Sequence, residues 1–546
     1  MKIAFSFRPH GSFLKKSTLA FACASSLMLT AVQAQQRVQT VFYILLENRN
    51  FTAGTDTSGG SVVLGNAAAP YINSLITPGN PNAAQVSYCT CYHNVLATPT
   101  GANPSIHPSE PNYVWFEAGS NLSKLDDNDP YGSGKSVQQI ANYLAANPSV
   151  SGQNISSLLQ NAGIPWSAYG EGTNLVTTGG TNSNAAISGQ HLTVTPEPAS
   201  NWTVPLASFS GNNASYLNPY NGSTQWNFAC KHTGSLFFTA TNGSTATTPN
   251  TTTSNPEAPH YPPLAQLATD LANNTVAPFV VITPDQYNDM HTALTGGFTY
   301  HGVHYTGDLA QVAQGDNFLS IVVPQIMASQ AYQNNGAIII WTDETEGTNQ
   351  NDFNHTLTEI VISPLAKGNG YASNLNYTHS SDLNTLQKIF QVTSQTPTGY
   401  LNDAANPSNS SNGQTGVGFG TGTAYDLSDL FVPGAIPPSI PTTQITPGGY
   451  ILNRRTNTVT QTVTVTNLLD GPLAGPLYLV AGGLSSNTTL VNSIGTTHYT
   501  APVGSPYVLV SGSGLAVGAS ATVTLQFTPP TAGAISDNLL VVGGQP

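Results

Sequence analysis

The chain has 546 residues, and 39% of them are hydrophobic, so it can bury a large core and wholesale disorder is excluded. Charged residues make up only 7%, against roughly 25% in an average soluble protein. Acidic residues outnumber basic ones 26 to 13, for a net charge of -13. This charge argues against nucleic-acid binding, because neutralising a phosphate backbone needs basic patches.

The N-terminus has the pattern of a secretory signal peptide. Basic residues from Lys2 to Lys16 precede a short apolar run over 19–32, and small residues end it at Ala34. The run is shorter than the roughly 20 residues that a membrane span needs, and no later segment reaches that length. We therefore expect cleavage of 1–34 and an exported protein, extracellular or periplasmic, without stable membrane insertion.

Three cysteines remain after the signal peptide: Cys89, Cys91 and Cys230. In an oxidising compartment we expect one disulfide from Cys230 to either member of the Cys89/Cys91 pair, with the pairing left open. No zinc-type spacing exists, so their role is predicted to be structural.

The next 400 residues alternate between apolar runs and helical patterns. Continuous apolar runs without alternation are typical of parallel strands that are buried on both faces. Together with the intervening helices they predict an α/β fold with a mostly parallel central sheet. The expected strands are 41–46, 279–282, 337–341 and 360–362, and the expected helices are 137–145, 154–162, 263–272 and 317–333.

A proline-rich stretch, 433–449, predicts a semi-rigid linker. After it, apolar residues alternate with threonines at period two, as in 459–465 and 521–527. This pattern predicts an accessory β-sandwich over 450–546, which leaves 35–432 as the catalytic part.

Acidic residues follow three of the predicted strands. Ligands of open α/β sheets bind at the carboxyl ends of strands, so these acids are expected to build one oxygen-rich pocket. Crowded carboxylates repel one another unless a cation lies among them, which indicates one or two divalent ions, with Mg, Mn, Ca and Zn all open. The alternative is that the acids cap the following helices. The residues concerned are Glu47-Asn48, Asp285, Asp289 and Asp343-Glu344, with His291 and His379 nearby in the sequence pattern.

Ser109 lies between two prolines, Pro108 and Pro111, in a context that opens a helix. A helix N-terminus attracts phosphoryl groups, and a metal ion there would activate the hydroxyl as a nucleophile. Asn112, three residues on, is placed to donate to a phosphoryl oxygen. The alternative is that Ser109 is a plain helix cap.

Taken together, these segments resemble the bacterial and fungal phosphoesterase family of acid phosphatases and phospholipases C, within the alkaline phosphatase superfamily. Six segments match in the family's order: 44–51 with its Glu-Asn pair, 107–113, 154–169, 282–291 with Asn-Asp-x-His, 315–344 with Asp-Glu, and 377–390 with a late histidine. The resemblance implies an alkaline phosphatase-like three-layer sandwich, followed here by an immunoglobulin-like β-sandwich.

The resemblance also implies roles for individual residues. A primary metal would be held by Glu47, Asn48, Ser109, Asp343 and Glu344. Asp289, His291 and His379 fall where a second metal is bound, or where phosphate binding and acid catalysis occur if that site is empty. His232 resembles a leaving-group acid.

Two segments depart from the family's usual pattern. Asn48-Arg49-Asn50-Phe51-Thr52 lacks an expected acid, and Lys231-His232-Thr233-Gly234 differs around the histidine.

The sequence therefore predicts a secreted, metal-dependent phosphoesterase that hydrolyses phosphate monoesters through a phosphoserine at Ser109. A phospholipase C that cleaves phosphodiesters is the alternative within this class. From another class, a non-catalytic surface or binding protein stabilised by a metal is also open, and so is the oligomeric state.

Overall fold

The structure is a computed structural model. The predicted signal peptide, 1–34, lies outside the residues that it describes. These are 36–54, 58–95, 107–173, 198–212, 214, 216–347, 355–405, 425–469, 471–498, 502–544 and 546.

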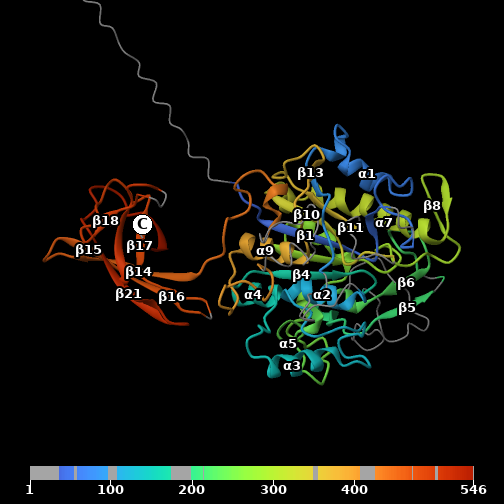
Figure 1. Ribbon diagram of the computed structural model, residues 1–546, viewed down its shortest axis with the longest axis horizontal. Coiled ribbons are helices and arrows are strands. Elements are labelled where there is room, and N and C mark those ends of the chain that lie inside the picture. The colour runs from blue at the N-terminus through green and yellow to red at the C-terminus, as the bar shows by residue number, and fades with distance from the viewer. Residues whose placement is uncertain are drawn as a thin grey trace, which may run out of the picture. The chain divides into compact units, whose positions relative to one another are not determined.

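A seven-stranded sheet forms the centre of the N-terminal part, in the order β13-β3-β12-β10-β1-β7-β4 (Figure 1). β1 pairs in parallel with both β10 and β7, and β4 continues in parallel on β7. Only β12 runs antiparallel to its neighbours, so the predicted α/β fold with a mostly parallel sheet is confirmed. The strands are β1 (Thr40–Leu46), β3 (Val86–Cys89), β4 (Trp166–Gly170), β7 (Phe279–Thr283), β10 (Gly336–Thr342), β12 (Glu359–Ile362) and β13 (Tyr371–Ser373).

Both faces of this sheet are covered by apolar side chains. Along β1, Val41, Tyr43 and Leu45 join one buried cluster, while the residues between them join another on the opposite face. This two-sided burial is the physical reason for the unbroken apolar runs.

Helices supply the other side of each cluster (Figure 1). α2, α4 and α9 pack on the face of Tyr43, and α1, α6, α7 and α8 pack on the other, while α3 packs against the outer side of α2. The helices are α1 (Pro70–Ile76), α2 (Glu110–Ala118), α3 (Ser136–Ala146), α4 (Ile155–Asn161), α5 (Thr239–Asn242), α6 (Leu267–Asn273), α7 (Gly307–Met327), α8 (Gln330–Gln333) and α9 (His379–Phe390).

The predicted helix 317–333 is in fact two helices, and α7 begins ten residues earlier than expected. Its first half is polar, which hid the helical pattern. Asp316 shows why polar residues are buried there: its carboxylate accepts hydrogen bonds from the backbone N–H groups of Tyr71 and Ile72, at 2.9 and 2.7 Å, at the start of α1.

Short two-stranded antiparallel sheets accompany the central sheet in the N-terminal part. They are β2 (Asn50–Ala53) with β11 (His355–Leu357), β5 (Phe209–Asn212) with β6 (Gln225–Phe228), and β8 (Phe298–Tyr300) with β9 (Val303–Tyr305). One 3₁₀ turn, η3 (Cys230–His232), is important for the site below.

The C-terminal part is made of antiparallel sheets, in the orders β14-β15-β21 and β18-β19-β17-β22, with a short pair β16-β20. Val463 and Leu525 from the first sheet share one buried cluster with Leu479 and Val508 from the second. The period-two prediction is confirmed for β15 and β21. The strands are β14 (Thr443–Asn453), β15 (Thr458–Asn467), β16 (Leu473–Ala474), β17 (Leu477–Gly482), β18 (Gly495–Thr496), β19 (Pro506–Ser511), β20 (Gly514–Leu515), β21 (Ser520–Phe527) and β22 (Asn538–Gly543).

Two details differ from the sequence predictions. The linker expected over 433–449 is shorter in the structure, because Ala435 and Ile436 are buried in a core cluster and β14 already begins at Thr443. The expected disulfide is not formed: all three cysteines are free, and Cys89 and Cys230 are buried in that cluster as small apolar side chains.

None of the described helices is both long and apolar enough to cross a membrane.

Candidate active site

Two neighbouring strands deliver polar side chains to the same edge of the sheet. Leu46 and Thr342 are opposite each other in the parallel pair β1/β10. The pairs Glu47–Asn48 and Asp343–Glu344 follow directly, so they leave the sheet side by side. The loop after β7 joins them, since the carbonyl of Asp289 accepts a hydrogen bond of 2.8 Å from the backbone N–H of Glu47. The predicted convergence of the strand-end acids is what the topology produces.

The backbone turns sharply at Asn48, where φ is 38°. This left-handed region is unfavourable for most side chains, and asparagine is one of the few that tolerate it. The turn is held by a hydrogen bond of 3.0 Å from the N–H of Asn48 to Oδ1 of Asp343.

Ser109 stands at the N-terminus of α2 but does not cap it. Its own backbone is helical, with φ -61° and ψ -43°, and its side chain makes no capping hydrogen bond. Oγ lies instead 2.9 Å from Oε2 of Glu47, 3.1 Å from Oε1 of Glu344 and 3.2 Å from Oδ1 of Asn48. The plain helix-cap alternative is therefore wrong. The strand-end acids likewise cap no helix in the described part of the chain.

The same face of α2 orients the carboxylates around Ser109. Tyr113, one helical turn on, donates a hydrogen bond of 2.7 Å to Oε1 of Glu47. Asn112 donates one of 2.9 Å to Oε2 of Glu344, so its amide nitrogen holds a carboxylate where the sequence predicted a phosphoryl contact. His107 lies with Nδ1 2.8 Å from Oε1 of Glu344.

Neither Tyr113 nor His107 was predicted from the sequence to have a role of its own. The signal that could have found Tyr113 is its spacing of four residues from Ser109, which places both side chains on one face of a helix.

Negative charge is crowded at this edge. Burial raises the pKa of Glu47, Asp343 and Glu344 well above the ordinary range. Repulsion between neighbouring carboxylates raises these pKa values further: the charge of Asp343 raises that of Glu47, the charge of Glu344 raises that of Asp343, and the charge of Glu47 raises that of Glu344. Each of the three is at most 1% exposed. Such a group of carboxylates is costly to assemble unless positive charge compensates it.

The donor set fits a divalent cation. A serine hydroxyl has one proton, so Ser109 can donate to only one of its three oxygen neighbours at a time. Oδ2 of Asp343 is buried and has no hydrogen-bond partner among the described residues. No three His, Cys, Asp or Glu side chains of the described chain are gathered closely enough to enclose a metal by themselves. Here an amide and a hydroxyl complete the carboxylates, and an all-oxygen set of this kind suits hard ions such as Mg²⁺, Mn²⁺ or Ca²⁺.

His232 is fully buried and lies next to the carboxylate of Glu47. Nε2 is 3.1 Å from Oε1 of Glu47 and Nδ1 is 3.6 Å from Oδ2 of Asp289, and neither contact has hydrogen-bond geometry. Its ring stacks on Tyr113 with centroids 5.0 Å apart. Burial first, and then the charge of Lys231, lower the pKa of His232 well below its usual value.

His379 is not placed as the sequence predicted. Its Nε2 lies 2.6 Å from the backbone carbonyl of Asp343, and its Nδ1 lies 2.8 Å from the hydroxyl of Tyr92. Since a carbonyl only accepts, Nε2 carries the proton, and both nitrogens are engaged. His379 therefore positions the backbone of Asp343 and presents no lone pair to a metal.

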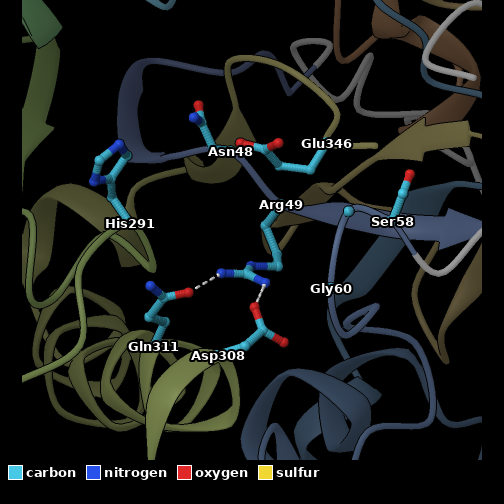
Figure 2. A pocket seen from close by; sticks show the side chains of 9 residues that line it. Asn48, Arg49, Ser58, Gly60, His291, Asp308, Gln311 and Glu346 are labelled. Carbon is cyan, nitrogen blue, oxygen red and sulfur yellow. Dashed lines mark hydrogen bonds and ion pairs between the residues drawn. The ribbon is translucent and has the colours of Figure 1, made fainter. Parts of the chain in front are cut away.

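His291 lines a pocket beside Asn48 (Figure 2). Its backbone N–H donates a hydrogen bond of 2.9 Å to Oδ1 of Asp289, and its ring centroid is 6.5 Å from that of His232. Burial first, and then the charge of Lys231, lower the pKa of His291. Asp289 and His291 thus lie at the same edge as the carboxylates, whereas the third expected partner, His379, faces elsewhere.

Asp285 has a structural role, because its carboxylate binds nearby backbone N–H groups. It is fully buried, and its carboxylate accepts hydrogen bonds from the backbone N–H groups of Tyr287, at 2.9 Å, and Asn227, at 3.3 Å.

Three solved structures resemble the chain with low identity and low TM-scores. A protein in the alkaline phosphatase superfamily from Vibrio parahaemolyticus has 10% identity and a TM-score of 0.30, covering 79% of this chain and 78% of that one. A Bacteroides thetaiotaomicron protein from a locus for the metabolism of multiple glycosaminoglycans has 11% identity and a TM-score of 0.34, covering 79% and 88%. A chitin-binding domain from Streptomyces coelicolor has 17% identity and a TM-score of 0.13, covering 19% and 91%.

No curated protein matches the chain. The model of the Phosphoesterase family, by contrast, matches residues 103–393, which is more than half of the chain. The matched region contains Ser109, His232, Asp289 and the Asp343–Glu344 pair. The chain belongs to the Phosphoesterase family.

Proposed function

We propose that this chain, a phosphoric ester hydrolase by its family, is a metal-dependent phosphomonoesterase in which Ser109 is the nucleophile. The observation that carries the proposal is the orientation of Ser109. Its hydroxyl makes no hydrogen bond to the backbone of its own helix and contacts the oxygens of Glu47, Asn48 and Glu344.

A divalent cation is proposed to be held by Glu47, Asn48, Ser109, Asp343 and Glu344. When bound, it would supply positive charge that lowers the pKa of the serine hydroxyl and offsets the charge of the carboxylates. The buried oxygen of Asp343 that lacks a hydrogen-bond partner supports this assignment.

The chain's own residues then account for the proton movements. Ser109 Oγ bonds to phosphorus as the bond from phosphorus to the leaving oxygen breaks, and the serine proton passes to a carboxylate oxygen in contact with it, such as Oε2 of Glu47. The leaving oxygen takes a proton from His291. Water next displaces Ser109 from the phosphoserine and gives a proton to His291, while the carboxylate returns its proton to Ser109 and inorganic phosphate is released.

A monoester is preferred to a phospholipid because of the surroundings of Asn48. The described residues that line the adjacent pocket include no aliphatic or aromatic carbon side chain. A diacylglycerol leaving group would lose contact with water there and gain no apolar contact in return.

Two further properties belong to the proposal. The N-terminal pattern supports export to the extracellular space or the periplasm. The antiparallel sheets with a shared apolar cluster support an immunoglobulin-like β-sandwich at the C-terminus, an accessory domain whose place in the function is open.

The test is hydrolysis of p-nitrophenyl phosphate by the whole protein, before and after chelation, with Ser109→Ala and a control, Ser133→Ala, in an exposed loop. We expect chelation to remove activity, a divalent metal to restore it, and Ser109→Ala to lower kcat by at least about a thousandfold. The control should match the native enzyme.

Other outcomes point elsewhere. Retained activity in Ser109→Ala overturns the nucleophile. Hydrolysis of phosphatidylcholine micelles without hydrolysis of monoesters identifies a phospholipase C. Tight metal binding with no hydrolysis of any ester identifies a binding protein.

A further inference from the structure

A pocket of about 290 Å³ opens next to the proposed nucleophile. Asn48 belongs to both places, since its Oδ1 lies 3.2 Å from Oγ of Ser109 and its side chain lines the pocket. A group bonded to phosphorus at Ser109 therefore has this pocket beside it. The volume is near the lower end of ligand pockets, about 300 Å³, which suits a small molecule.

Arg49 stands in the middle of this pocket, between Gln311 and Asp308 (Figure 2). Nη1 pairs with Asp308, and Nη2 donates to Oε1 of Gln311 at 2.6 Å and to the carbonyl of Met290 at 2.9 Å. Arg49 is 3% exposed, and its Nε is buried with no hydrogen-bond partner among the described residues. Arg49 is therefore held in one orientation by its neighbours, and it fixes Oε1 of Gln311 at the pocket.

The loop that closes the pocket needs glycine at Gly60. A Cβ added there would lie 2.6 Å from Oδ1 of Asp308, and φ is 74°. The close approach keeps Asp308, whose other oxygen accepts a hydrogen bond of 2.7 Å from Ser61, fixed against Arg49. The pocket is therefore shaped by the fold and by this ion pair together.

The lining mixes donors and acceptors without a surplus of either kind. Among the described lining residues, Asn48, Ser58 and Gln311 are neutral, Asp308 and Glu346 are carboxylates, and Arg49 and His291 are basic. Arg49 is already paired with Asp308, so a second phosphate would find no unpaired guanidinium and would lie beside the carboxylate of Glu346. A quaternary ammonium group would find no Trp, Tyr or Phe ring to enclose it among the described lining residues. Hydroxyl groups, which both donate and accept, match such a lining best.

We propose that this pocket is a subsite for the leaving group, and that it selects monoesters of neutral, polyhydroxylated alcohols such as sugars and polyols. The proposal rests on the proposed function, because it assigns the leaving group of the same reaction. Arg49 holds Oε1 of Gln311, so the amide nitrogen of Gln311 is the donor to the hydroxyl groups, and Glu346 accepts from them.

Two substrates of equal size isolate the hydroxyl groups. Glucose-6-phosphate and cyclohexylmethyl phosphate are both esters of a primary alcohol on a six-membered ring, and they differ mainly in the ring's hydroxyls and oxygen. We expect the native enzyme to prefer glucose-6-phosphate by at least about tenfold in kcat/KM.

Gln311→Leu tests the lining. It removes the amide at similar size and leaves Arg49 its contacts with Asp308 and Met290. We expect kcat/KM to fall about tenfold for glucose-6-phosphate and less than about threefold for cyclohexylmethyl phosphate. The same substitution at Gln330, an exposed residue of α8, should change neither value.

Several results would overturn the subsite. These are equal kcat/KM for the two ring substrates, an equal loss on both in Gln311→Leu, or a preference for phosphocholine or for a hexose bisphosphate. If the enzyme hydrolyses p-nitrophenyl phosphate in the same experiment, only the subsite fails. If no phosphate ester is hydrolysed, the proposed function fails with it.

Discussion

Tyr113 donates its phenolic hydrogen to Oε1 of Glu47, at 2.7 Å. The other oxygen of the same carboxylate, Oε2, contacts Ser109 at 2.9 Å. Because Ser109 and Tyr113 are four residues apart on one helix, the same face of α2 contacts both carboxylate oxygens of Glu47. The nucleophile and the orientation of its acidic neighbour are thus set by a single element.

Tyr113→Phe tests the hydrogen bond from Tyr113 to Glu47. The substitution keeps the ring that stacks on His232 but leaves Oε1 of Glu47 without its donor, so the carboxylate is free to rotate. We expect kcat on p-nitrophenyl phosphate to fall about tenfold to a hundredfold, with KM changed much less. Steady-state kinetics measure this, and Tyr143→Phe on α3 is the matched control. An unchanged kcat would show that Glu47 needs no such support.

The proton donor to the leaving group is tested by the choice of substrate. A nitrophenolate leaves without a proton, whereas an alkoxide does not. We expect His291→Asn to lower kcat/KM for cyclohexylmethyl phosphate about a hundredfold and for p-nitrophenyl phosphate less than about tenfold. His232→Asn, whose nitrogens face Glu47 and Asp289, should lower both by the same factor. A selective loss in His232→Asn instead would transfer the role to that residue.

Stability should depend on pH through Glu117, a buried residue of α2 that lies eight residues after Ser109. Burial raises its pKa from 4.5 to about 7, although the N–H and hydroxyl of Ser156 donate to it at 3.3 and 3.0 Å. Between these two values the folded state holds a proton that the unfolded state has lost. The free energy of unfolding therefore falls as pH rises through this window, by about 1.4 kcal/mol per unit from this group, and levels off above it.

Glu117→Gln removes that titration. Between about pH 4.5 and about pH 7 the native protein should lose unfolding free energy relative to the variant, because only the native protein carries the titrating carboxyl group. Above about pH 7 the difference between the two proteins should stay constant. Denaturant unfolding followed by tryptophan fluorescence reports on the N-terminal part alone, because all five tryptophans precede residue 342. A difference that is the same at every pH would contradict the assignment.

Much of the site was predictable from the chain because strand and acid are contiguous in it. The apolar run that ends at Leu46 is followed at once by Glu47, and the run that ends at Trp341 is followed closely by Asp343. Burial on both faces requires an unbroken apolar strand, and the carboxyl ends of parallel strands share an edge. These local patterns were sufficient to predict the α/β fold and the cluster of carboxylates, and the family resemblance placed Ser109 beside that cluster.

Directions of side chains and strands were not predictable in this way. Nothing in the residues around His379 says that its nitrogens reach Tyr92 and the carbonyl of Asp343, 36 residues away. In the same way, β12 has the apolar composition of a parallel strand and runs antiparallel. Both outcomes depend on which distant segments pack together.

The sequence by itself determined which residue types reach the edge of the sheet, because that depends on spacing along one strand or one helix. The tertiary structure alone decided which of them meet. It left the Ser109 hydroxyl without a capping bond to its own helix and placed Nε2 of His379 against the backbone carbonyl of Asp343. It also left the cysteines unpaired and placed Arg49 in the lining of a pocket. The physical reason is that a contact between distant segments is selected by the packing and hydrogen bonding of the whole core, and no short stretch of sequence contains that information.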